Sequence, residues 1–144
     1  MLYECNEDKV PLEKEITYLE NYIALKLLKD SRGMKVSVNL EKNHGDQLIA
    51  PMLFIPFVEN AFKHGNVEDL EKGWIEIDLK TRDRKILFDV KNTYAAAAST
   101  KDQVGGIGLV NVNRQLDLLY PNKHQLTITD KEGIYSAHLE IDLV

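Results

Sequence analysis

Cysteine is nearly absent from this sequence: its 144 residues include one cysteine, Cys5, so no disulfide can form within the chain. The Cys/His spacing typical of a metal site is also missing, which favours a cytoplasmic setting over an oxidising one. No apolar run reaches the roughly 18–20 residues that a membrane-spanning helix needs, and no signal peptide is visible. We therefore expect this part of the protein to lie in the cytoplasm.

The sequence also has no excess of basic residues. Its 18 Lys and Arg residues are outnumbered by 23 Asp and Glu residues, which gives a net charge of −5 at pH 7. This balance excludes the broad basic surface of a nucleic-acid-binding domain, so we expect no nucleic-acid partner. A compact polyanion such as a nucleotide stays possible, because helix N-termini, a few lysines and a divalent cation suffice to bind it.

An amphipathic helix is predicted near the N-terminus. Pro11 stands at the early position that proline favours in helices, and apolar residues recur at helical spacing until Leu28. This helix either packs only on its own domain or also pairs with a helix outside this chain, and its wide apolar stripe favours the second alternative. We place the boundary of this segment at residues 1–33.

The rest of the chain, residues 34–144, alternates predicted strands and helices. Two pairs of strands have the short connections of antiparallel hairpins, and helices lie between them. This order predicts an α+β fold, a two-layer α/β sandwich with a mixed, mostly antiparallel sheet. The predicted elements are a strand at 34–40, a helix that begins near Pro51 and is kinked or restarted at Pro56, hairpins at 74–91 and 125–144, a long loop at 92–104 and a helix at 109–119.

The stretch 55–65 combines a polar face with an apolar one. Asn60, Lys63 and His64 share one side of a helix because they stand at i, i+3 and i+4. The opposite side carries Ile55, Val58 and Phe62. Such a helix is either an ordinary amphipathic helix or the wall of a ligand pocket.

A glycine cluster precedes the last predicted helix. Gly105, Gly106 and Gly108 leave the backbone N–H groups at the start of this helix accessible, and the helix dipole there favours an anion. A loop that needs a hinge would also carry glycines. The cluster does not follow the strand–turn–helix pattern of a dinucleotide fold, and it lacks the Gly-Lys-Ser/Thr ending of a P-loop.

Together these stretches resemble the ATP-binding catalytic domain of the GHKL superfamily, which includes sensor histidine kinases, gyrase-type topoisomerases, ninety-kilodalton heat-shock chaperones and mismatch-repair ATPases. Residues 57–65 look like its N box, and residues 105–116 look like its last glycine box. The chain most resembles the LytS/YehU-like histidine kinases, in which the pattern of residues 10–23 ends the dimerisation region and that of residues 118–121 also recurs. The resemblance covers about residues 10–144 and implies a Bergerat-type ATPase fold.

The resemblance also implies roles for the polar face. Asn60 would ligate Mg²⁺ with its amide oxygen, and Lys63 would neutralise phosphate charge. His64 would hydrogen-bond a phosphate or the ribose, and Glu59 would orient the attacking group or the water shell of the metal. Glu59 and Lys63 are also spaced for an i, i+4 ion pair, which could coexist with catalysis.

The glycine box would complete the nucleotide site. Gly106 and Gly108 would let the loop at 93–104 close over ATP, and Leu109 and Val112 would help to line the adenine side. The superfamily places an aspartate followed by glycines after the second strand of the hairpin, whereas here this place has no Asp-x-Gly. Asn92 offers a neutral acceptor for the adenine amino group, which should bind it less strongly than a carboxylate does.

Asp89 is the fallback acceptor for adenine, although strand alternation points it to the face opposite Val90. The phosphate-accepting histidine of the kinase family is missing as well. The sequence contexts of His44, His64, His124 and His138 do not match the family pattern, and His44, His124 and His138 read as structural or surface residues. The resemblance then implies a fragment that phosphorylates a histidine outside it.

In the full-length protein, the resemblance implies a homodimer formed through upstream helices, a cognate response regulator as partner and a membrane anchor. Two other functions stay open: an anti-sigma-type serine kinase or other ATPase of the superfamily, and a non-catalytic scaffold that has lost nucleotide binding.

Overall fold

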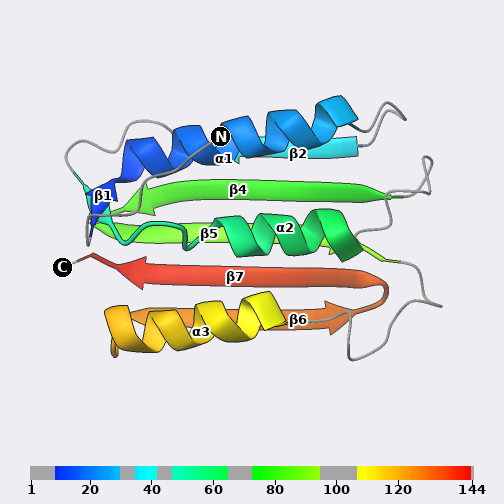
Figure 1. Cartoon of the computed structure of the whole chain (residues 1–144). Coiled ribbons are helices and arrows are strands. Elements are labelled where there is room, and N and C mark those ends of the chain that lie inside the picture. Colours follow the sequence, from blue (N-terminus) through cyan, green and yellow to red (C-terminus); the bar gives the residue numbers. More distant parts are fainter. Residues whose placement is uncertain (1–8, 30–34, 42–46, 65–72, 95–106, 144) are drawn as a thin grey trace.

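The computed structural model describes residues 9–29, 35–41, 47–64, 73–94 and 107–143 (Figure 1). The helices are α1 (Leu12–Lys29), α2 (Ile55–His64) and α3 (Ile107–Leu119). The strands are β1 (Val10–Pro11), β2 (Lys35–Leu40), β3 (Leu48–Ile49), β4 (Trp74–Arg82), β5 (Lys85–Thr93), β6 (His124–Lys131) and β7 (Ile134–Asp142).

Five of these strands form one sheet in the order β2-β4-β5-β7-β6. β2 pairs with β4 in parallel, and every other neighbouring pair in this sheet is antiparallel. All three helices lie on one face of the sheet, with α2 between α1 and α3 (Figure 1). The predicted α+β sandwich with a mixed, mostly antiparallel sheet is therefore confirmed, as are both predicted hairpins.

The core lies between the sheet and the helices. Alternate residues of each central strand point to this inner face, as the alternating burial of β4, β5 and β7 shows. At its centre the Phe88 ring of β5 lies 4.7 Å from the ring of Phe54 and 5.9 Å from that of Phe57, between ring centroids. The first half of α1 closes the core with Leu12, Ile16, Leu19 and Ile23, and α3 does so with Leu109, Val112 and Leu116.

The start of α2 differs from the prediction. Residues 48–49 form β3, which pairs with β1, and Pro51 lies in a turn before the helix rather than in its first turn. The helix begins at Ile55, with Pro56 in its first turn, where the missing N–H of proline costs no hydrogen bond. The Phe54 carbonyl accepts the N–H groups of Phe57 and Val58 at 3.1 and 3.4 Å.

The end of β5 also differs. The sequence predicts a loop from Asn92, but β5 continues to Thr93. Asn92 pairs with Ile75 of β4 on one side and with Tyr135 of β7 on the other, so two neighbouring strands extend the ladder beyond the last apolar residue. Asn92 therefore belongs to the sheet and not to the loop that follows it.

The second half of α1 exposes apolar side chains. Leu25 is 49% exposed and Leu28 is 79% exposed, whereas the apolar side chains of the first half of the helix are buried against the domain. Pairing of α1 with a helix outside this chain stays a prediction. Among the helices in the described ranges, none has the length and apolar character that crossing a bilayer requires.

Candidate functional site

The two faces of α2 are arranged as predicted. Ile55 and Val58 are buried, Phe62 is partly buried against the core, and the adjoining face carries polar side chains. Asn60 is half-buried and Lys63 is exposed. The backbone of His64 ends the helix, but its side chain lies outside the described part, so its position on the polar face stays a prediction.

Three elements bring the described residues of the predicted site to one end of the sandwich. α2 runs in the same direction as β5, and α3 runs in the opposite direction, so the end of α2, the start of α3 and the end of β5 lie together (Figure 1). α2 and α3 also contact each other. The polar residues near the end of α2 and Asn92 near the end of β5 therefore border the same end of the interhelical layer.

The glycine box is only partly visible. The backbone of Gly108 lies in the first turn of α3, and Leu109, next to it, is buried with 4% exposure. Gly105, Gly106 and most of the predicted closing loop at 93–104 lie outside the described residues. The roles of these residues toward ATP stay predictions.

Asn92 and Tyr135 are buried polar residues with unpaired atoms. Asn92 is 1% exposed and Tyr135 is 5% exposed, and they are register partners in β5 and β7 on the helix-facing side of the sheet. The Asn92 amide nitrogen donates to the Thr93 carbonyl at 3.1 Å, but among the described residues its Oδ1 atom and the Tyr135 hydroxyl have no hydrogen-bond partner. Each such group costs about 1–3 kcal/mol if it stays unpaired. The arrangement fits a ligand with polar atoms at this place.

Asp89 is not available to the same ligand. It lies on the outer face of the sheet, where its Oδ1 atom is 2.6 Å from Nδ1 of His138 on β7. The strand alternation that the sequence predicts for Asp89 is thus correct. The prediction of Asp89 as the fallback acceptor for adenine is wrong, because its side chain lies on the other face of the sheet from Asn92.

Glu59 lies on the side of α2 that approaches α1. It is exposed. Burial, with smaller effects of the charges of Glu59 and Tyr18, raises the pKa of Tyr22 on α1 to about 12. The carboxylate of Glu59 thus stands in solvent beside the helix that leads into the domain.

Known proteins have similar sequences and folds. No protein-family model matches the chain. The chain is 26% identical over 142 residues to the sensor protein LytS of Oceanobacillus iheyensis, in an alignment that covers 88% of this chain and 24% of LytS. The solved catalytic domain of histidine kinase ThkA superposes with a TM-score of 0.63 at 16% identity, over 94% of this chain and 95% of that domain.

A third relative was solved with a ligand. Full-length ShkA in complex with AMPPNP superposes with a TM-score of 0.63 at 15% identity, over 100% of this chain and 32% of ShkA. The fold is that of a histidine kinase catalytic domain. The resemblance to LytS-type sensor kinases that the two boxes predict is confirmed, and the chain spans about a quarter of the length of LytS.

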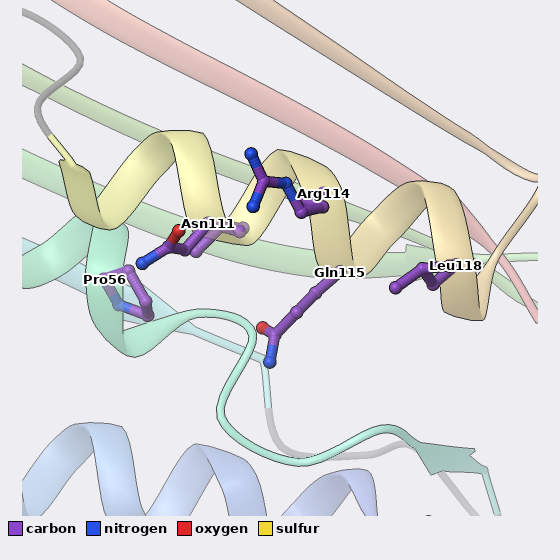
Figure 2. A pocket seen from close by; sticks show the side chains of 6 residues that line it. Pro56, Asn111, Arg114, Gln115 and Leu118 are labelled. Carbon is purple, nitrogen blue, oxygen red and sulfur yellow. The ribbon is translucent and has the colours of Figure 1, made fainter.

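One pocket of about 460 Å³ in the histidine kinase fold lies away from the predicted site residues. It opens between α3 and the first turn of α2. Figure 2 shows Asn111 next to Pro56, with Gln115 and Leu118 further along α3. Glu59, Asn60, Lys63 and Asn92 do not line it. The pocket therefore does not mark the nucleotide site that the boxes predict.

Tyr135 is a candidate site residue that the sequence does not single out. A tyrosine at an inward position of a strand is an ordinary core residue, and nothing in its local sequence distinguishes it. Only the register of β7 against β5 places it opposite Asn92. Only a prediction of how the two hairpins pair, in this register, could have pointed to Tyr135.

The outer face of the fold supports a pH-dependent prediction. Burial lowers the pKa of His138, but the hydrogen bond and charge of Asp89, with smaller effects of Glu140, outweigh it and raise the pKa above its usual value. The folded state therefore binds the proton more tightly than the unfolded chain. This contribution to stability is complete below the unfolded pKa of about 6.5 and is lost as pH rises through the higher folded value.

We expect His138→Gln to remove this pH dependence. Because the side chain of His138 is 36% exposed, solvent screens the pair, and the contribution stays below about 1 kcal/mol. Urea denaturation at pH 6 and pH 8.5 should show a larger loss of unfolding free energy for the unchanged chain than for the variant. Equal losses for both proteins would contradict the prediction.

Proposed function

We propose that this chain is the Mg-ATP-binding catalytic domain of a LytS-type sensor histidine kinase. The unpaired Oδ1 atom of Asn92 carries the proposal, because it offers a buried acceptor for the amino group of adenine at the end of the sandwich where α2 ends. The likeness to LytS, which is a sensor protein, and the adenine nucleotide AMPPNP in the complex of ShkA support it.

The polar face of α2 would hold the phosphate end of the nucleotide. Mg²⁺ in nucleotide sites keeps several waters and phosphate oxygens and needs few protein ligands, so the amide oxygen of the half-buried residue Asn60 suits it. Lys63 is exposed and supplies positive charge one turn further along, with His64 beside it in sequence. Gly106 and Gly108 would bring backbone N–H groups to the phosphates at the start of α3.

The reaction would transfer the γ-phosphoryl group to a histidine outside this chain. A nitrogen of the acceptor imidazole forms a bond to the γ-phosphorus, the bond from phosphorus to the β,γ-bridging oxygen breaks, and ADP leaves. Protein groups contribute mainly position and charge stabilisation to such transfers. The exposed Glu59 would orient the incoming imidazole, since it faces solvent on the side of α1.

The full-length protein would supply what this chain does not contain. The acceptor histidine would lie on helices that precede α1, and the exposed leucines of α1 would continue a homodimer contact formed by those helices. The phosphoryl group would then pass to a response regulator. We propose that the domain works in the cytoplasm as part of a membrane-anchored protein.

Calorimetric titration of the chain with ATP, with and without Mg²⁺, tests the proposal. With Mg²⁺ we expect a dissociation constant for ATP of roughly 1 µM to 1 mM, the range of typical substrate KM values. Without Mg²⁺ we expect weaker binding. Labelled ATP should then phosphorylate a supplied acceptor-helix segment but not a serine-containing protein substrate. Phosphorylation of serine would favour an anti-sigma-type kinase, and no nucleotide binding would favour a scaffold.

A further inference from the structure

The base end of the proposed nucleotide site contains two unpaired polar atoms rather than one. Besides Oδ1 of Asn92, the hydroxyl of Tyr135 is buried and has no partner in the part of the chain that the structure describes. The two residues face each other across β5 and β7, so their Cβ atoms are about 5 Å apart. Two polar side chains that stand opposite each other on neighbouring strands can contact different atoms of one ligand.

The donor and acceptor characters of the two groups differ. The Asn92 amide nitrogen already donates to the Thr93 carbonyl, which fixes the amide with Oδ1 as the free atom, an acceptor. Turning the amide over would place two carbonyl oxygens against each other. Asn92 therefore presents an acceptor only, although it carries no charge.

The Tyr135 hydroxyl is free to donate. Burial raises the pKa of Tyr135 to about 12, with a smaller effect of the Asp130 charge, so the hydroxyl keeps its proton. Asp130 is the register partner of Tyr135 on β6, but its Oδ1 atom accepts a hydrogen bond from the Tyr94 hydroxyl instead. The proton of Tyr135 thus has no protein acceptor within the described ranges.

We propose that Tyr135 reads the purine ring and determines base specificity together with Asn92. The Asn92 Oδ1 atom accepts from the 6-amino group of adenine, and the Tyr135 hydroxyl donates to the neighbouring ring nitrogen N1. This inference rests on the proposed function and deepens it. Guanine carries a carbonyl oxygen at position 6, which would face the fixed oxygen of Asn92, so a neutral pair still selects adenine over guanine.

A double-mutant cycle with one change in the protein and one in the ligand tests the hydrogen bond from the Tyr135 hydroxyl to N1. The protein change is Tyr135→Phe, and the ligand change is from ATP to 1-deaza-ATP, which lacks the N1 acceptor. We expect each change alone to weaken binding about 5- to 10-fold, the effect of one hydrogen bond. In the variant, 1-deaza-ATP should bind as well as ATP does, because the interaction is already lost.

The stability of the unliganded variant separates recognition from a structural role. Removing an unpaired buried hydroxyl should leave the melting temperature unchanged or raise it. The matched control is Tyr120→Phe, because the buried Tyr120 hydroxyl accepts the Ala50 N–H at 2.9 Å. This control should lower the melting temperature and leave the ratio of ATP to 1-deaza-ATP affinity unchanged.

The outcomes distinguish the two proposals. If the unchanged chain binds ATP but Tyr135→Phe binds it equally well, or if the two losses simply add, the role of Tyr135 is wrong while the proposed function stands. Equal affinity of the unchanged chain for GTP and ATP would also contradict the proposed selection of adenine by Asn92 and Tyr135. A chain that binds none of these nucleotides contradicts both.

Discussion

Asn60→Ala is expected to abolish binding of Mg-ATP, with a loss of affinity on the order of 100-fold or more, while the fold stays intact. The side chain of Asn60 is half-buried at the polar edge of α2, and alanine favours helices, so the variant loses an amide oxygen without opening a cavity in the core. The Mg²⁺ that accompanies ATP would lose its protein ligand. Calorimetry with Mg-ATP measures the loss, and circular dichroism during thermal unfolding confirms the fold.

The comparison without metal makes this test specific. If Asn60 acts through Mg²⁺, the variant and the unchanged chain should bind ATP with similar, weak affinity when the metal is removed. Asn21→Ala is a matched control, because Asn21 is an exposed asparagine on another helix, α1. It should bind Mg-ATP as the unchanged chain does. Full affinity of Asn60→Ala for Mg-ATP would overturn the assignment of the N box.

Local periodicity was enough to predict the parts of the fold that depend on local sequence. The helical spacing of residues 55–64 predicted which side of α2 meets the core, and alternation predicted both hairpins and the outward direction of Asp89. These features follow from the 3.6- and 2-residue periods of helix and strand. Their physical cause lies within each segment, so a single sequence reveals it.

The features that sequence reading missed depend on residues far apart in the chain. Asn92 belongs to β5 because both neighbouring strands extend past it, although its own side chain is typical of a loop. Tyr135 becomes a candidate site residue only through its register with Asn92. The late start of α2 has a similar cause, since a side chain of α1 fixes the turn before it.

That side chain is Glu15, and Glu15→Ala is expected to destabilise the domain by about 3 kcal/mol. Glu15 is 2% exposed, and its Oε1 atom accepts the N–H of Met52 at 2.7 Å. Met52 has a positive φ of 65°, which is a strained conformation for a residue with a side chain. The variant leaves the Met52 N–H unpaired and removes the contact that holds this turn.

Thermal unfolding should show the effect as a fall of about 10 °C in the melting temperature. Glu15→Gln keeps an acceptor oxygen and should lose only part of this stability. Glu13→Ala is the control, because Glu13 is an exposed acid in the first turn of the same helix and contributes at most about 1 kcal/mol through the helix dipole. If Glu15→Ala were no less stable than Glu13→Ala, α1 would not fix the start of the helix that carries Asn60.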